Sequence, residues 1–258
     1  MQLSDGLKQK ILDHAKQCYP AECCGLIVND DYIPCQNIAP NHNQFEICPK
    51  DWAKAEDMGK IQAIVHSHPD GSTQASDLDL HQIELHSLTW IIISYSELEY
   101  ADKPDFAVYT PCGYQAPLIG RAYYHGWQDC YAIVRDFYQR EFNIALPDFE
   151  RSDLWWEDKH HQALYADNFS KADFVEVENT GHYHYGDVLL CRVGRTEHIN
   201  HAVIWLGDKT TLKSENVEPC VGNTIILHHP YNRPSVREIF GQNWAERVAK
   251  VVRHRDLL

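Results

Sequence analysis

HSHPDGSTQASDLD, residues 66–79 of this 258-residue chain, is the stretch that says most about its fold. It follows a largely apolar run, Ile61–Val65, that has the composition of a buried strand. Alternate side chains of a strand face the same way, so His66 and His68 can point in one direction. A proline and a glycine then end the strand and begin a loop.

A helix is expected to begin just after this loop. Ser76 has the character of an N-cap, and Asp79, three residues later, completes a capping-box pattern. The Asp79 carboxylate is therefore expected in the first helical turn, close to the end of the strand that carries the histidines. Two imidazoles and one carboxylate, with a fourth position left open, form the ligand set of a catalytic zinc site.

The pattern H-x-H-P-x6-S-x-x-D resembles the motif of the JAMM (MPN+) metallopeptidases, and every position is filled here. That family also carries a glutamate before a small apolar strand, and Pro20–Gly25 followed by Leu26–Val28 is similar to that element. The resemblance implies three ligands for Zn²⁺: His66, His68 and Asp79. It further implies that Glu22 is the general base on the metal-bound water and that Ser76 helps to hold the developing oxyanion.

Composition excludes several classes of function. A formal net charge of -14 argues against binding to a nucleic-acid backbone, which needs clustered Lys and Arg. The nine cysteines include no C-x-x-C pair, so neither a disulfide framework nor a zinc ribbon is expected. No apolar run approaches the ~20 residues of a membrane-spanning segment. The N-terminus lacks a signal peptide, which predicts folding in a cytoplasm.

The first part of the chain alternates between helical and extended patterns. Helices are expected over 4–18 (with Ser4 as N-cap), 49–60 and 76–87, and strands over 24–28, 61–66, 89–95 and 106–109. This alternation predicts a compact α/β domain with its site at strand ends. Residues 110–117 contain two prolines and a glycine, so we place a boundary there, between domains 1–112 and 116–258.

A second group of reactive residues lies beyond that boundary. Cys130 opens an amphipathic helical run, and a thiol at a helix N-terminus is favoured as thiolate, the nucleophilic form. His201 stands at the head of an apolar strand, 200–207. The next strand, 224–227, ends in the pair His228 and His229.

The order Gly-x-x-Asp-Cys, then His before an apolar strand ending in Gly, then a polar residue after the next strand, resembles the NlpC-type cysteine peptidases. Residues 186–189 are similar to the Gly-Asp element that precedes the histidine strand in that family. The resemblance implies a papain-like α+β domain with Cys130 as nucleophile, His201 as general base and His228 as the orienting third residue. His229 is adjacent and faces the other way, so the choice between the two stays open.

Three further features are interpreted more simply. A second H-x-H, His182 and His184, has no helix-borne acid at a suitable offset and is expected to be a solvated strand or loop. Ala202 and Val203 depart from the Val-Gly common in the NlpC-type family, which changes one wall of the cleft. The aromatic stretch 155–165 is expected to be a packed helix beside that cleft.

The pair of domains resembles the tail tip assembly proteins of lambda-like phages. The resemblance implies a tail tip component that cuts peptidoglycan stem peptides and carries a zinc-dependent (iso)peptidase domain. Its expected partners are stem peptides and other tail tip proteins, and its expected locations are the host cytoplasm during assembly, the virion tail tip and the cell wall. Two alternatives remain: an assembly protein whose peptidase folds serve binding, and a JAMM-type deconjugating isopeptidase.

Overall fold

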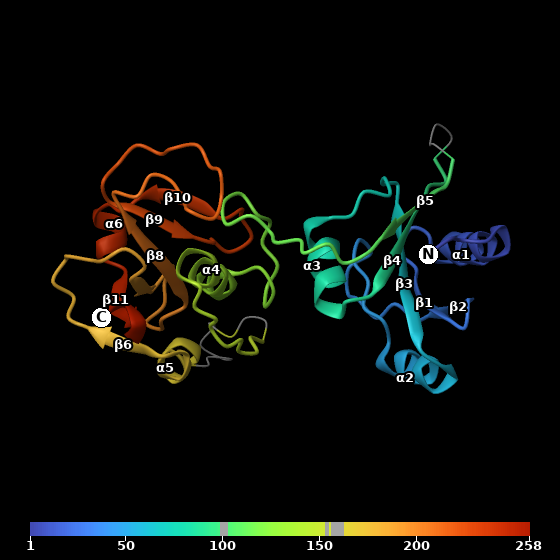
Figure 1. Ribbon diagram of the computed structural model, residues 1–258, viewed down its shortest axis with the longest axis horizontal. Coiled ribbons are helices and arrows are strands. Elements are labelled where there is room, and N and C mark those ends of the chain that lie inside the picture. The colour runs from blue at the N-terminus through green and yellow to red at the C-terminus, as the bar shows by residue number, and fades with distance from the viewer. Residues whose placement is uncertain (99–102, 153–154, 156–162) are drawn as a thin grey trace. The chain divides into compact units, whose positions relative to one another are not determined.

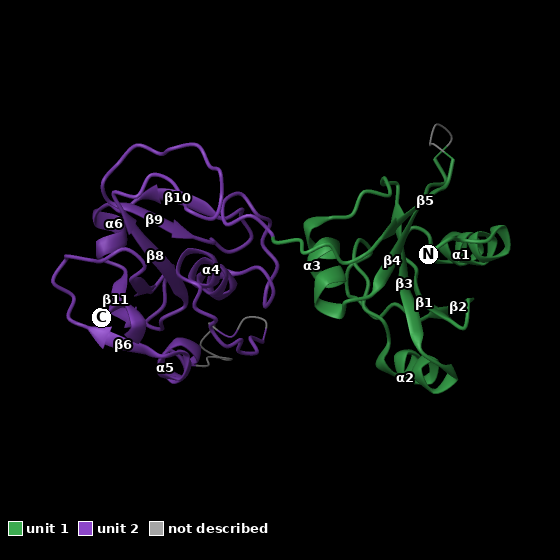
Figure 2. Ribbon diagram, in the orientation of Figure 1, with its two compact units in different colours: residues 1–115 green, residues 116–258 purple. Residues whose placement is uncertain are grey.

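The computed structural model describes residues 1–98, 103–152, 155 and 163–258, which form two compact units, Met1–Gln115 and Ala116–Leu258 (Figures 1 and 2). Each unit contains its own sheet and its own apolar core. The predicted mixed α/β architecture is confirmed. That residues 1–112 and 116–258 are two separate peptidase domains stays a prediction. No helix in the described part of the chain has the length and apolar character needed to cross a bilayer.

A five-stranded sheet forms the centre of the first unit. Its strands are β1 (Cys24–Val28), β2 (Asp31–Cys35), β3 (Ile61–Pro69), β4 (Thr89–Tyr95) and β5 (Asp105–Tyr109), in the order β2-β1-β3-β4-β5. Only the β3–β4 pair is parallel within this sheet. Because α3 connects these two parallel strands, the start of α3 lies near the end of β3, as in any strand–helix–strand crossover.

Helices cover both faces of this sheet. Helix α1 (Asp5–Cys18) packs on one face, while α2 (Pro49–Met58) and α3 (Asp77–His86) pack on the other. Strand residues alternate between the two cores: Ile27 contributes to the α1 side and Leu26 to the α2/α3 side. The predicted caps are present, since Ser4 Oγ accepts from Leu7 N at the start of α1 and Ser76 forms a complete capping box in α3.

The segment at the C-terminal end of the first unit is hydrogen-bonded to α3. Glu84 Oε1 accepts hydrogen bonds from the backbone N–H groups of Cys112, Gly113 and Tyr114, at 2.7, 2.9 and 3.0 Å. The Tyr114 hydroxyl donates to Asp77 Oδ1 at 2.7 Å. These bonds explain why the unit extends to Gln115 rather than ending at residue 112.

The second unit is built on a six-stranded antiparallel sheet. Its strands are β6 (Phe174–Val177), β7 (Val188–Cys191), β8 (His201–Gly207), β9 (Ile225–His228), β10 (Val236–Ile239) and β11 (Val248–His254), in the order β10-β9-β8-β7-β11-β6. Helix α4 (Cys130–Phe137), which continues as a π-helical turn over Tyr138–Phe142, packs on one face. The short helix α6 (Gln242–Ala245) adds Trp244 to the core on the other face.

Most expected elements are present with small shifts at their ends, and β3 continues three residues further, to Pro69. Strands β2, β6, β7, β10 and β11 and helix α6 were not predicted. A helix was expected over 155–165. Its last two residues belong to α5 (Leu164–Asn168), while residues 156–162 lie outside the described residues. All nine cysteines lie in the described part of the chain, where they are free thiols.

Candidate functional site

The residues singled out at 66–79 converge in the first unit. Strand β3 carries His66 and His68 on one side near its end, and Asp79 lies in the first turn of α3. His66 is buried between aromatic rings: Phe45 stacks on it at 4.6 Å between centroids, and Trp90 meets it edge-on at 5.4 Å. The three side chains form a cluster that could hold a metal ion.

The spacing of the donor atoms fits a tetrahedral ion. The two Nε2 atoms of His66 and His68 are 3.0 Å apart. Asp79 places Oδ1 3.4 Å from His66 Nε2 and Oδ2 3.5 Å from His68 Nε2. With zinc–ligand bonds of about 2.0–2.1 Å, the edges of a zinc tetrahedron are about 3.3 Å long. The three residues are of the types that bind Zn²⁺, and their donor atoms lie close enough together to reach one ion.

Outer hydrogen bonds hold two of these donors in place. His68 Nδ1 lies 2.8 Å from the Ser72 carbonyl oxygen, which places the proton on Nδ1 and leaves the Nε2 lone pair for a metal. Asp79 Oδ2 accepts from Ser76 N and from Ser76 Oγ, both at 2.7 Å. The hydroxyl expected to hold an oxyanion is thus already bonded to a metal-ligand candidate, so that role for Ser76 stays a prediction.

Glu22 lies just before β1 and is 8% exposed. Burial raises the pKa of its carboxyl to about 7, a shift that the positive field of His68 reduces and the charge of Asp79 increases. These interactions place Glu22 within electrostatic reach of His68 and Asp79. A carboxyl with a pKa near neutrality can accept a proton and return it, which is what a general base at this site needs.

In the second unit, the start of α4 is organised by Asp129. Its side chain accepts from the N–H groups of Tyr131 and Ala132, at 3.0 and 2.9 Å, and caps the helix. It also forms a buried ion pair with Arg151 Nε at 2.6 Å. These bonds fix the turn that presents Cys130, and they give a structural reason for the aspartate before the cysteine.

The acidity expected for Cys130 is not found. Burial raises the pKa of its thiol to about 11, and the adjacent Asp129 carboxylate raises it further. Hydrogen bonds from the Tyr165 hydroxyl, 3.1 Å from Sγ, and from the Ala202 N–H act in the opposite direction but do not compensate. The expectation of a thiolate favoured by the helix terminus was therefore wrong. Burial of the thiol first, and the Asp129 carboxylate second, outweigh the partial charge of the helix end.

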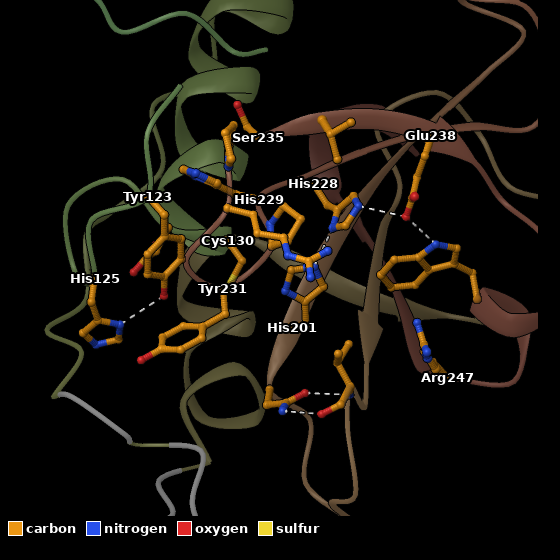
Figure 3. A pocket seen from close by; sticks show the side chains of 18 of the residues that line it. Tyr123, His125, Cys130, His201, His228, His229, Tyr231, Ser235, Glu238 and Arg247 are labelled. Carbon is orange, nitrogen blue, oxygen red and sulfur yellow. Dashed lines mark hydrogen bonds and ion pairs between the residues drawn. The ribbon is translucent and has the colours of Figure 1, made fainter. Parts of the chain in front are cut away.

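A chain of hydrogen bonds extends from His201 away from the thiol. His201 Nε2 lies 2.9 Å from His228 Nδ1, and His228 Nε2 lies 3.0 Å from Glu238 Oε1 (Figure 3). Trp244 Nε1 donates to the same Glu238 oxygen at 2.6 Å. Its indole stacks on His201 at 6.0 Å and meets His228 edge-on at 4.9 Å. His228, rather than His229, is therefore the residue in contact with His201.

The carboxylate at the end of this chain sets the direction of every bond in it. An ionised carboxylate only accepts, so His228 donates from Nε2 and its Nδ1 carries the lone pair. That lone pair accepts from His201 Nε2–H, which leaves a lone pair on His201 Nδ1. Burial lowers the pKa of both histidines, and His228 lowers that of His201 further, so His201 is neutral at pH 7. The arrangement prepares His201 Nδ1 to accept a proton.

These residues line a cavity of about 1150 Å³ that Cys130, His201 and His228 share (Figure 3). Buried His229 also faces it, packed edge-on against Tyr123 at 5.2 Å, and burial lowers its pKa to about 4. Sequence reasoning missed Tyr165, Glu238 and Trp244. Of these three, Trp244 alone has a signal in the sequence. It is a large aromatic residue between polar neighbours, shortly before the C-terminal strand.

Comparison with known proteins finds relatives of both units. A family model of prokaryotic homologs of the JAB domain matches residues 4–106, and that of the NlpC/P60 family matches residues 120–253. Tail tip assembly protein K of Escherichia phage N15 is 34% identical over 260 residues, covering 97% of this chain and 97% of that protein. Tail tip assembly protein K of Escherichia phage lambda is 33% identical over 208 residues, covering 80% of this chain and 88% of that protein.

Among solved structures, a JAB1/MPN domain protein from Archaeoglobus fulgidus is similar to part of this chain. The match covers 43% of this chain and 90% of that protein, at 24% identity and a TM-score of 0.30. The family matches follow the order of the two units along the chain. The prediction of a JAMM/MPN-like domain followed by an NlpC-type domain is confirmed.

Proposed function

The chain belongs to the family of phage tail tip assembly protein K, and from this premise we propose that it is a tail tip component with peptidoglycan endopeptidase activity in its second unit. The single observation that carries the proposal is the hydrogen-bonded chain from His201 through His228 to Glu238, in the cavity that also contains Cys130. The proposed partners are stem peptides and other tail proteins. The proposed sites of action are the host cytoplasm during assembly and the cell wall.

In the proposed reaction, His201 Nδ1 takes the proton of the Cys130 thiol as Sγ attacks the carbonyl carbon of the scissile amide. The imidazolium then gives this proton to the leaving nitrogen, the carbon–nitrogen bond breaks and an acyl thioester forms. A water molecule, deprotonated by the same imidazole, hydrolyses the thioester and restores the thiol. His228 and Glu238 hold the imidazole in the required tautomer and stabilise its charged form.

We further propose a zinc-dependent (iso)peptidase in the first unit, with His66, His68 and Asp79 holding the metal. Bound Zn²⁺ would supply a Lewis acid that lowers the pKa of a coordinated water to about 7. Glu22, with its pKa of about 7, would take a proton from the attacking water and return it to the leaving group. Ser76 orients Asp79 through its hydroxyl, and its proposed contact with an oxyanion would require that bond to break.

Digestion of purified diaminopimelate-type peptidoglycan, followed by mass spectrometry of the soluble fragments, tests the endopeptidase. The wild type should release fragments with new stem-peptide ends, and Cys130→Ala should release none. The matched control is Cys220→Ala, because Cys220 is also a partly buried free thiol of the second unit but lies outside the cavity. Cleavage that persists in Cys130→Ala would assign the activity elsewhere.

A further inference from the structure

The charge inside the Cys130 cavity is opposite to the charge of the chain. The protein carries a formal net charge of -14, yet three arginines from three different loops border the cavity: Arg195, Arg233 and Arg247. The two acidic side chains in its lining are already engaged. Asp129 is paired with Arg151, and Glu238 binds His228 and Trp244. Within the described ranges, no carboxylate lies at ion-pair distance from any of the three arginines.

Arg247 packs against a residue that contacts the proposed general base. Its guanidinium carbon lies 5.2 Å from the centre of the Trp244 ring, and the same indole stacks on His201. The cation–π contact holds the planar group beside the catalytic histidine without using its N–H donors. Arg247 is half-buried and lines the cavity (Figure 3).

We propose that Arg247 binds a free carboxylate of the substrate next to the scissile bond, with Arg195 and Arg233 supplying positive potential along the rest of the cavity. The proposal rests on the proposed endopeptidase function and specifies its substrate class as an anionic peptide. A guanidinium matches a carboxylate with two parallel N–H···O bonds, which fixes orientation as well as charge. A carboxylate reaching the site would also give these arginines the ion pairs that they lack among the described residues.

Long-range electrostatics favours such a contact for an acidic substrate. A negatively charged peptide approaching a chain of net charge -14 is repelled at long range, over roughly 10 Å in 0.1 M salt. The lining of the cavity contains three arginines and two acidic residues, and this excess of positive charge favours anionic over neutral peptides. The discrimination should amount to about tenfold in kcat/KM, the value of one charge-assisted bidentate contact of about 1.4 kcal/mol.

The test compares two synthetic stem tetrapeptides that differ only in whether the α-carboxyl of D-glutamate is free or amidated. Wild type should cleave the free acid about tenfold more efficiently. Arg247→Gln should lose this preference mainly through a higher KM for the acid, so that its kcat/KM values for the acid and the amide become equal. Arg192→Gln is the matched control, because this exposed arginine lies outside the cavity and its substitution removes the same charge.

Three other outcomes are informative. Equal cleavage of both peptides by wild type would overturn the carboxylate site and leave the endopeptidase intact. A loss of preference in Arg192→Gln equal to that in Arg247→Gln would replace the specific contact by a general field. If wild type cleaves neither peptide, the endopeptidase proposal fails. The carboxylate site is then tested by calorimetry, which measures the affinity of each peptide for Cys130→Ala. Tighter binding of the acid that disappears in Cys130→Ala/Arg247→Gln supports it, and equal binding overturns it.

Discussion

At the scale of single residues, the orientation of the second site depends on a carboxylate that belongs to no motif. Glu238 has an exposed side chain, 43%, on an edge strand, yet one of its oxygens accepts from both His228 and Trp244. Because a carboxylate offers no proton, it imposes one tautomer on both histidines. Glu238 thus determines, through His228, which nitrogen of His201 carries the proton.

Replacing Glu238 by Ala should lower kcat on stem peptides by on the order of tenfold to a hundredfold, with little effect on KM, because the imidazole is no longer held in one tautomer. The pH profile should shift as well. Glu238 stabilises the protonated form of the histidine pair and raises its pKa, so its removal should move the acidic limb of kcat/KM to lower pH.

Glu246→Ala is the control for this prediction. Glu246 is also exposed and lies just after α6, but its side chain bonds only to Gln242 among the residues that the structure describes. A fall in kcat with an unshifted pH profile in Glu238→Ala would point to loss of packing around Trp244 rather than to loss of the hydrogen-bonded chain.

Cys130 provides a second prediction at this scale. With a thiol pKa of about 11 and a neutral His201, alkylation by iodoacetamide should accelerate roughly tenfold per pH unit from pH 7 to about pH 10, since only the thiolate reacts. Peptide mapping by mass spectrometry measures the rate at each cysteine, with exposed Cys112 as the internal reference. A rate already at its plateau at pH 7 would reveal a preformed thiolate–imidazolium pair.

At the scale of helices and strands, the cap of α3 has two tasks. Ser76 closes the capping box and also orients Asp79, whereas Ser4 only caps α1. Both Ser→Ala variants should destabilise the first unit by about 1 kcal/mol. Only Ser76→Ala should also weaken zinc binding, by on the order of tenfold, because outer hydrogen bonds orient metal ligands.

Competition with a chromogenic chelator measures zinc affinity in both cap variants, and thermal unfolding of the metal-free proteins measures stability. Ser76→Thr should restore the affinity, since threonine offers the same hydroxyl. If Ser76→Ala binds zinc as tightly as Ser4→Ala does, then Asp79 does not depend on its serine partner.

The elements that sequence reasoning found and missed differ in a physical way. Strands β3 and β8 and helices α3 and α4 were predicted because dense apolar runs and capping residues identify them locally. Strand β2 was missed because Pro34 interrupts it, which an edge strand tolerates. Strand β10 is largely exposed and has no apolar alternation. Its Glu238 meets His228 only through strand pairing, so no local pattern could reveal the contact.

At the scale of the whole molecule, each apolar cluster of described residues belongs to one unit. The clusters around Ile27 and Leu26 belong to the first unit, and those around Phe137 and Trp205 belong to the second. The zinc-ligand candidates and the Cys130 cavity likewise have no residue in common. Each unit should therefore respond separately to a ligand that binds to it.

Calorimetry should resolve two unfolding transitions, of which zinc raises only one. Free zinc at a hundred times its Kd stabilises the unit that binds it by about 2.7 kcal/mol, equivalent to several degrees in Tm. His68→Ala should abolish the shift, while His182→Ala, from the exposed second H-x-H, should preserve it. A single transition displaced as a whole by zinc would contradict the independence of the units.

The bonds from Glu84 to residues 112–114, with that from Tyr114 to Asp77, have a mechanical consequence. Strand β5 ends at Tyr109, but the chain is fastened again to both ends of α3 before it reaches the second unit. Tension applied along the chain from residue 115 onward is thus borne by α3 and not by the edge strand. The helix that takes this load is the one that carries Asp79.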